Sequence, residues 1–278
     1  MSIRFQVIQD EHQLDPSKVD GARALCLHDC LERRLLISPD TGEELFLSVD
    51  GSSLTDGNNS YEIKHNCPLL YPGGIREILL DASYPEPLTP LQQYVLLGKI
   101  KQSGEINAPF DSIPARKHQY RLHRFCEQLN GLVLDIGSDR PSHSMLFLPH
   151  NCEYLGLDPF AANGEFRIIG LGEILPLQAA SVDSVLFNTS LDHILDYHTA
   201  IDEAFRVLKP GGTLVIATYA WLERATLLTD SVHFHHFRES EIFGALQTFF
   251  AVKKVCRYED PKHDSHRYGL YVMATKVF

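Results

Sequence analysis

The second half of the chain alternates short apolar runs with helix-like segments, and this alternation limits the possible folds more than any other feature. Each run is short and almost wholly apolar, as a strand buried on both faces of a sheet must be. The five runs cover residues 132–136, 153–157, 166–169, 182–187 and 213–217. A helix is expected between the last two runs, because apolar residues from Tyr197 to Leu208 recur at a period of 3.6 residues. Strands that alternate with helices form a parallel sheet with helices on both faces.

A different pattern closes the chain. A helix is predicted near residues 239–249, and two more strands are predicted at 251–258 and 268–275. A short loop joins these strands, so we expect an antiparallel hairpin at one edge of the sheet. The sequence therefore predicts an α/β fold with a mostly parallel seven-stranded sheet and a C-terminal antiparallel hairpin.

The first 119 residues have another composition. Turn-forming residues cluster at 39–42, 50–53 and 56–60 with short apolar runs between them, which predicts a small β-rich segment. Several prolines between residues 81 and 117 flank one helix-like stretch that has an apolar face. We therefore expect three parts: a small N-terminal domain at 1–80, a connector with cap helices at 81–119 and the main domain at 120–278.

The charge balance limits the partners of the protein. The 278 residues carry a net charge of −11 at neutral pH, and both halves of the chain are acidic. Such a chain lacks the basic surface that holds a phosphate backbone or an anionic membrane, so nucleic acid is not an expected partner. No apolar run approaches the roughly 18 residues that a membrane-spanning helix needs.

Six cysteines are spread thinly over the chain, at positions 26, 30, 67, 126, 152 and 256. This spacing is not that of a disulfide framework, and it predicts free thiols in the cytoplasm. Cys26 and Cys30, with His28 between them, allow a zinc site, although structural zinc sites usually have paired short spacings. Because Leu25 and Leu27 flank the pair, small core side chains on a helix are the favoured interpretation, and no metal is predicted.

Polar residues follow the first two predicted strands of the main domain. Asp135, Gly137, Ser138 and Asp139 end the first strand, and Asp158 ends the second. In a parallel sheet, ligands bind at the carboxyl ends of the strands. An acidic residue at the end of the second strand is placed to accept hydrogen bonds from a ribose diol. Taken alone, Asp158 equally well starts a turn with the proline that follows it.

The main domain resembles class I S-adenosylmethionine-dependent methyltransferases of the broad type that includes small-molecule enzymes. The likeness runs from about Tyr120 to the end, and its most specific segment is 206–214. The matching segments are residues 133–137, 156–158, 173–177, 181–185, 191–193, 206–214 and 235–241. The resemblance implies a Rossmann-like fold, S-adenosylmethionine as cofactor and S-adenosylhomocysteine as product.

The resemblance also implies which residues hold the cofactor. They are Asp135, Gly137, Ser138, Asp139, Asp158, Pro159, Glu173, Ile174, Asn188 and Ser190. The glycine motif is degenerate, because the family's Gly-x-Gly-x-Gly is here Gly137-Ser138-Asp139-Arg140-Pro141. The replacements remove backbone freedom and, at the proline, an N–H donor. Where the family often has an aspartate for the adenine amine, this chain has Leu171, so Glu173 or a backbone carbonyl is expected to serve.

Histidines supply the candidate general bases. His193 lies just after the fourth strand, near the expected methyl group, and His235 belongs to a cluster with His233 and His236 before the last helix. A histidine titrates near neutral pH and suits proton removal from an acceptor. The alternative is that His193 bonds to the backbone of its own loop and that the cluster lies on a solvated helix entry.

The N-terminal segment carries a second resemblance. Residues 36–45 and 61–70 are similar to the small zinc-ribbon-like proteins that partner tRNA and protein methyltransferases. The first cysteine knuckle of that family is replaced here by Ser38-Pro39-Asp40-Thr41, so no zinc is implied. A ribbon without metal must be held by packing, against the main domain or a second chain. The segment therefore predicts a homodimer contact or a protein partner.

Three functions are consistent with these patterns. The first is methyl transfer to a small-molecule substrate, with the N-terminal segment capping the active site. The second is a catalytically inactive methyltransferase-fold protein that binds a partner, which the degenerate glycine motif favours. The third is an rRNA methyltransferase, against which the acidic balance and the missing zinc ligands count.

Overall fold

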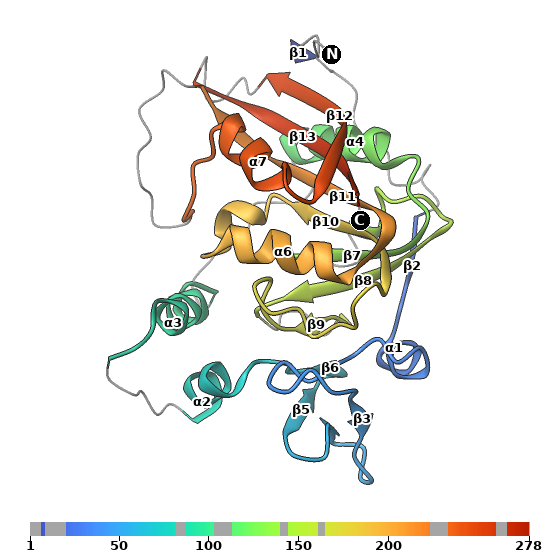
Figure 1. Ribbon diagram of the computed structural model, residues 1–278, viewed down its shortest axis with the longest axis vertical. Helices are drawn as coiled ribbons and strands as arrows, with labels where there is room; N and C mark the ends of the chain where they lie inside the picture. Colours follow the sequence, from blue (N-terminus) through green and yellow to red (C-terminus); the bar gives the residue numbers. More distant parts are fainter. Residues whose placement is uncertain are drawn as a thin grey trace.

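The computed structural model of the chain describes residues 7–8, 21–81, 87–102, 113–139, 144–160, 165–222, 233–259 and 266–277. Within these ranges the largest element is a nine-stranded mixed sheet (Figure 1). Its strands, in spatial order, are β1 (Val7–Ile8), β12 (Phe250–Glu259), β13 (Arg267–Lys276), β11 (Leu208–Trp221), β10 (Val182–Asn188), β7 (Gly131–Ile136), β8 (Cys152–Asp158) and β2 (Arg23–Ala24), with β9 (Ile168–Ile169) also paired to β8.

The seven strands predicted for the main domain all form. Strand β10 runs parallel to β7 and β11, β7 runs parallel to β8, and β8 runs parallel to β9. Strand β13 is antiparallel to both β11 and β12. The predicted α/β fold, with a mostly parallel sheet and a C-terminal antiparallel pair, is therefore confirmed.

Two strands of the large sheet were not predicted. Strands β1 and β2 come from the N-terminal segment and pair in parallel with β12 and β8. Each is two residues long, too short for an apolar period to be visible in the sequence. Residues 209–212 interrupt the strand pairing near the start of β11, and Gly211 there has a φ of +74°. They lie within β11, where the register against β10 shifts between Val182 and Ser184.

Helices cover both faces of the large sheet. On one face, α6 (Tyr197–Val207) buries Ala200 and Ala204 together with α7 (Glu239–Leu246) against Leu134 and Val185. On the other face, α4 (Ile113–Cys126) packs against alternate residues of the same strands, such as Val133 and Leu186. The core thus lies in two layers, one on each side of the sheet.

The expected β-rich N-terminal segment is present as a second sheet at the lower end of the molecule in Figure 1. It consists of β3 (Phe46–Leu47), β4 (Ser53–Thr55), β5 (Ser60–Lys64) and β6 (Cys67–Pro68), and α1 (Leu27–Glu32) precedes it. Leu54 and Tyr61 are fully buried in the same core as Leu134 of β7. The small sheet therefore packs against the main sheet.

Two helices of the connector form a cap. α2 (Gly73–Asp81) and α3 (Pro90–Gln102) contribute Ile75 and Val95 to an apolar cluster that also contains Ile169 and Leu171. Helix α4 runs across residue 120, and the proposed division of the chain at residues 80 and 119 stays a prediction. Every helix in the described ranges is too short or too polar to cross a membrane.

Candidate functional site

The carboxyl ends of β7, β8 and β10 lie level with one another at one edge of the large sheet. Ile136 is in register with Leu157 of β8 and with Phe187 of β10. The segments that follow these strands begin at Gly137, Pro159 and Thr189. The edge therefore brings together most of the residues predicted to hold a cofactor, and we call it the carboxyl edge.

Gly137 makes the tight turn that leaves β7. Its φ is +85°, and a Cβ atom added there would overlap the Ser190 side chain. The amides of Gly137 and Ser138 both donate to the Leu157 carbonyl, at 2.8 and 3.1 Å. The Ser190 hydroxyl donates to the Ile136 carbonyl. Glycine is thus required at this position, and Ser190 fixes the approach of the two strand ends.

Two buried polar atoms beside this turn lack partners. Asp135 is 1% exposed; Tyr154 Oη donates to its Oδ2 at 2.8 Å, while its Oδ1 has no hydrogen-bond partner among the described residues. Burial raises the pKa of Asp135 to about 6. Ser138 is also 1% exposed, and its Oγ has no hydrogen-bond partner within the same ranges. Unsatisfied buried polar atoms are rare in native proteins, and a ligand is one way to complete them.

Arg167 holds the loop after β7 through hydrogen bonds to the backbone of that loop. Its side chain is fully buried, and its Nη1 donates to the Ser138 carbonyl at 3.0 Å and to the Asp139 carbonyl at 2.6 Å. Sequence reasoning missed this residue, although an arginine inside the apolar run 166–169 was the signal. Arg140 and Pro141, which complete the altered glycine motif, lie outside the described residues.

Asp158 has the geometry of a residue that begins a turn. Its Oδ1 accepts from the Phe160 amide at 2.8 Å, as a carboxylate that begins a turn does. Burial raises the pKa of Asp158 to about 7. The neighbouring Pro159 carbonyl accepts a hydrogen bond from the Tyr71 hydroxyl, so the segment before α2 holds this turn in place.

The predicted adenine contacts lie further along the same edge. Glu173 is 7% exposed, its Oε1 accepts from the Asp196 amide at 3.4 Å, and burial raises the pKa of its carboxyl. The Ile174 amide donates to the Leu171 carbonyl at 3.2 Å, which closes a small turn. Glu173 is therefore a buried acceptor beside the start of α6.

Asn188 ends β10 and is held by a histidine that sequence reasoning missed. His118 Nε2 lies 2.7 Å from Asn188 Oδ1, and His118 Nδ1 lies 2.6 Å from Tyr271 Oη. Burial lowers the pKa of His118. His118 shares a helical face with Leu122 and Phe125, and this polar residue on an apolar face was the available signal.

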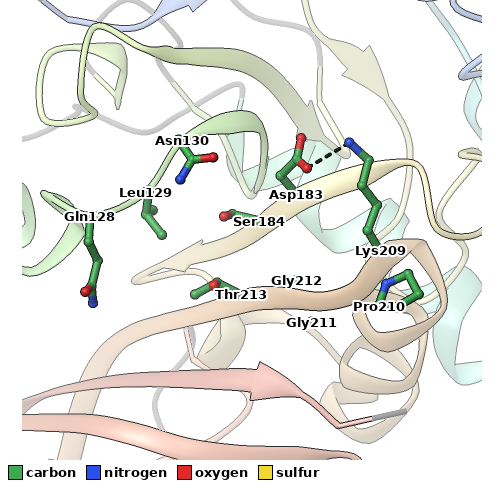
Figure 2. A pocket seen from close by; sticks show the side chains of 10 residues that line it. All are labelled: Gln128, Leu129, Asn130, Asp183, Ser184, Lys209, Pro210, Gly211, Gly212 and Thr213. Atoms are coloured by element: carbon green, nitrogen blue, oxygen red, sulfur yellow. Dashed lines mark hydrogen bonds and ion pairs between the residues drawn. The ribbon is translucent and has the colours of Figure 1, made fainter.

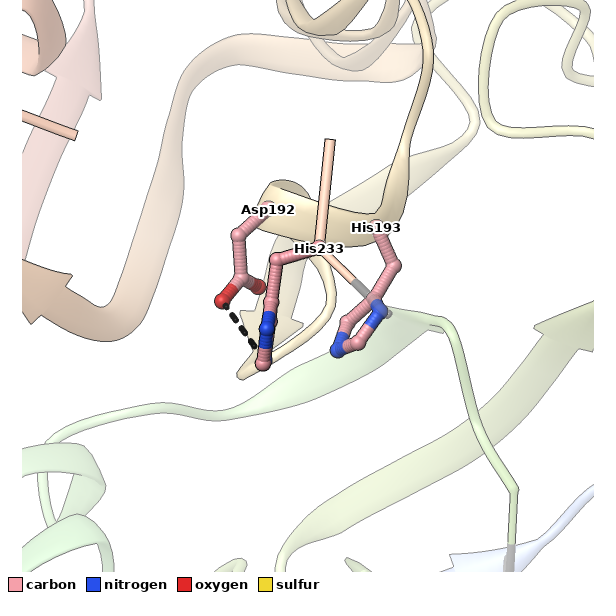
Figure 3. Close-up of side chains that lie close together, drawn as sticks. All are labelled: Asp192, His193 and His233. Atoms are coloured by element: carbon pink, nitrogen blue, oxygen red, sulfur yellow. Dashed lines mark ion pairs between the residues drawn. The ribbon is translucent and has the colours of Figure 1, made fainter. Parts of the chain in front are cut away.

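The two predicted bases have different surroundings. His193 lies on the short 3-10 helix η2 (Leu191–His193), where its ring centroid is 4.7 Å from that of His233 (Figure 3). His235 Nε2 lies 3.0 Å from the carbonyls of both Ile194 and Leu195, so this nitrogen carries a hydrogen and donates it to the backbone. His235 thus holds the segment that follows η2 through hydrogen bonds, whereas His193 lies on η2 itself, the element after β10.

A separate hollow lies at the opposite edge of the sheet, where these strands begin (Figure 2). It is lined by Gln128, Asn130, Asp183, Lys209 and other residues, and Lys209 Nζ lies 2.8 Å from Asp183 Oδ1. Because ligands of parallel sheets bind at the carboxyl ends of strands, this hollow is not the candidate cofactor site.

Comparison with known proteins finds a family match within the main domain. Residues 134–216, from β7 to β11, match the family described as "Methyltransferase domain". The fold is similar to a Burkholderia thailandensis 1,6-didemethyltoxoflavin-N1-methyltransferase at a TM-score of 0.55 and 20% identity, covering 70% of this chain and 94% of that one. It is also similar to the [4+2]-cyclase SpnF at a TM-score of 0.52 and 13% identity, and this likeness covers 67% of this chain and 94% of the cyclase chain. No curated protein matches the sequence.

The predicted resemblance to methyltransferases is therefore confirmed over residues 134–216, the segment that matches the family model. The two structural likenesses, at 20% and 13% identity, show the fold alone. The resemblance of the N-terminal segment to zinc ribbons stays a prediction, as do the roles of the individual site residues.

Proposed function

We propose that the protein transfers a methyl group from S-adenosylmethionine to a small-molecule acceptor. The observation that carries the proposal is the methyltransferase-domain match from β7 to β11, the segment that builds the carboxyl edge. The similar Burkholderia protein supports it, because that protein is an N-methyltransferase with a bound small-molecule substrate and S-adenosylhomocysteine.

The residues of the carboxyl edge fit such a cofactor. The turn at Gly137 leaves no room for a Cβ atom, and Asp135 Oδ1 and Ser138 Oγ are buried without partners in the described part of the chain. Asp158 would accept hydrogen bonds from a ribose diol through the oxygen that Phe160 does not use. Glu173 or the Leu171 carbonyl would accept from the adenine amine, with Ile174 beside the ring.

The bound cofactor would supply an electrophilic methyl group on a sulfonium centre. The protein then has to align the acceptor, exclude water and, for a protonated acceptor, remove a proton. His193 is the proposed base because it follows β10 directly and its backbone carbonyl is held by Tyr94 Oη of the cap at 2.7 Å. Asn188, fixed by His118, would orient the acceptor or the cofactor.

One set of contacts favours the second function, an inactive partner protein. The amides of Gly137 and Ser138 donate to the Leu157 carbonyl, and Arg167 donates to the carbonyls of Ser138 and Asp139, so these four backbone groups already have partners. The similar protein SpnF is a cyclase, which illustrates that this fold does not fix the reaction. For the third function, an rRNA methyltransferase, the net charge of −11 is the counter-argument.

The N-terminal segment supports a proposal about protein contacts. Phe46, Leu47 and Val49 in and after β3 are exposed large apolar side chains, which are typical of a contact surface. We propose that this surface binds a second copy of the chain or another protein. Light scattering of the purified protein and of Phe46→Ser tests the homodimer directly.

All six cysteines are free thiols, which agrees with the proposed cytoplasmic location.

Isothermal calorimetry with S-adenosylhomocysteine tests the proposed function. We expect the wild-type protein to bind this ligand, and Asp158→Ala to bind it at least about tenfold more weakly because the ribose acceptor is lost. Asp202→Ala, on the exposed face of α6, is the matched control and should bind like wild type. If the wild-type protein does not bind at millimolar ligand, both enzyme functions are wrong. Equal binding by Asp158→Ala would contradict the ribose contact alone.

A further inference from the structure

Three side chains of metal-ligand type meet beside the end of β10. Asp192 and His193 are adjacent on η2, and His233 comes from the segment before α7 (Figure 3). One potential ligand atom from each residue lies within 4.8 Å of the other two. Two segments that are 40 residues apart in the chain thus supply two imidazoles and one carboxylate to one place.

The carboxylate of this group is buried and incompletely bonded. Asp192 is 7% exposed, and its Oδ1 has no hydrogen-bond partner within the described ranges. Its Oδ2 lies 3.9 Å from His233 Nε2, which is too long for a hydrogen bond. A buried carboxylate oxygen is costly unless a donor or a cation completes it, and among the described residues no hydrogen-bond donor completes Asp192 Oδ1.

The backbone around the group is held by hydrogen bonds to its carbonyl groups. The amides of Phe234 and His235 donate to the Asp192 carbonyl, at 2.9 and 3.2 Å. Tyr94 Oη donates to the His193 carbonyl at 2.7 Å, and His235 Nε2 donates to the carbonyls that follow η2. The cap, η2 and the segment before α7 are therefore held together before any ligand binds, as a preorganised site requires.

We propose that Asp192, His193 and His233 bind one divalent transition-metal ion. Two imidazoles and one carboxylate suit ions such as Zn²⁺, Co²⁺ or Fe²⁺ and leave coordination positions open. Metal–ligand bonds of about 2.0–2.2 Å place neighbouring donors about 3–3.5 Å apart, so side-chain rotation has to draw the three atoms together by roughly 1 Å.

The position of the ion suggests what its open sites would take. The group directly follows Asn188 and Ser190 at the carboxyl edge, where the acceptor would have to lie. With the ion bound, His193 would be a ligand and not the base. An oxygen or nitrogen of the acceptor bound to the ion would instead lose its proton to solvent more readily. This role rests on the proposed function, whereas binding of the ion does not.

Titration of the full-length protein with Co²⁺, followed by visible absorption and calorimetry, tests the site. We expect one ion per chain at the site, with at least a tenfold loss of affinity in both Asp192→Asn and His233→Gln. His28→Gln is the matched control, because His28 and Glu32 form an exposed histidine–carboxylate pair at 3.1 Å, and it should bind Co²⁺ like wild type. Absence of binding by wild type, or equal binding by all four proteins, would overturn the proposal.

A parallel titration with S-adenosylhomocysteine separates this inference from the proposed function. Thermal unfolding of each variant first establishes that it folds. Folded variants that keep S-adenosylhomocysteine binding and lose Co²⁺ binding are the expected result. If wild type binds Co²⁺ and not S-adenosylhomocysteine, the metal site stands and the methyltransferase function falls. If wild type binds S-adenosylhomocysteine and not Co²⁺, the metal site falls alone.

Discussion

Two polar centres of the molecule are built in opposite ways. The first lies at residues 38–41, and we call it the knuckle. Ser38 Oγ accepts from the amides of Asp40 and Thr41 and lies 2.7 Å from Tyr61 Oη. Tyr61 Oη donates to Asp40 Oδ2 at 2.8 Å, and Asp40 Oδ1 accepts from the Gly73 amide at 2.7 Å. The polar groups of the knuckle thus bond to one another and to the start of α2.

The second centre is the carboxyl edge, where the polar groups do not close on one another. Asp135 Oδ1, Ser138 Oγ and Asp192 Oδ1 are all buried, and none of them has a hydrogen-bond partner among the described residues. A polar network that only stabilises the fold is expected to satisfy its members, whereas a binding site keeps groups open for its ligand. We therefore propose a structural role for the knuckle and a binding role for the carboxyl edge.

The largest expected effect is that of Gly137→Ala at the carboxyl edge. The new methyl group overlaps the Ser190 side chain and sits on a backbone with a φ of +85°, so we expect a loss of about 3 kcal/mol in the free energy of unfolding and loss of S-adenosylhomocysteine binding. Gly244→Ala in α7 is the control, because a Cβ there meets nothing within 4 Å. We expect this variant to gain up to about 1 kcal/mol. Equal stability of the two variants in urea unfolding would contradict the account.

The next effect is the pH dependence contributed by Asp135. Its pKa is about 6 in the folded protein and 3.8 as the reference value, so the folded state holds the proton more tightly. The stability contributed by this group is complete below pH 4 and is lost as the pH rises through 6, by up to about 3 kcal/mol. Asp135→Asn should remove this loss, so its stability relative to wild type should rise between pH 4 and pH 7.

Asp202→Asn, at an exposed position of α6, is the control for this comparison. Urea unfolding at pH 4, 5, 6 and 7 measures the difference between each variant and wild type. A difference for Asp135→Asn that stays constant over this range would show that the carboxyl of Asp135 is not desolvated as described.

The smallest effect is expected at the knuckle. Tyr61→Phe removes the hydroxyl that joins Ser38 to Asp40, and we expect a loss of about 1–2 kcal/mol in the free energy of unfolding. Affinity for S-adenosylhomocysteine should not change, because the knuckle is a structural centre. Reduced affinity in a folded Tyr61→Phe protein would remove the distinction between the two centres.

The sequence predicted the framework of the fold well, for physical reasons that particular elements make clear. Residues 182–187 form an apolar run that has to be buried on both faces, and β10 occupies that place. Strands β1 and β2 have no such pattern, since their pairing depends on edges of the sheet that form elsewhere in the chain. The spacing of apolar residues predicts which residues are buried, but it does not predict which strand a two-residue strand pairs with.

The site was predicted in part for the same reason. Topology alone brings Asp135, Asp158 and Asn188 to one edge, because the ends of parallel strands coincide. The remaining contacts join residues that are far apart in the chain. Arg167 and Ser138 are 29 positions apart, His118 and Asn188 are 70 apart, and Asp192 and His233 are 41 apart. Such contacts depend on how helices and loops pack, which no spacing in the sequence encodes.

Amide hydrogen exchange with and without S-adenosylhomocysteine tests the central claim most directly, because one experiment reads both centres. The account predicts slower exchange at residues 135–139 and 188–193 when the ligand is present, and unchanged exchange at the knuckle, residues 38–42. Protection confined to the hollow around Asp183 and Lys209, or protection at the knuckle with none at the carboxyl edge, would contradict the account.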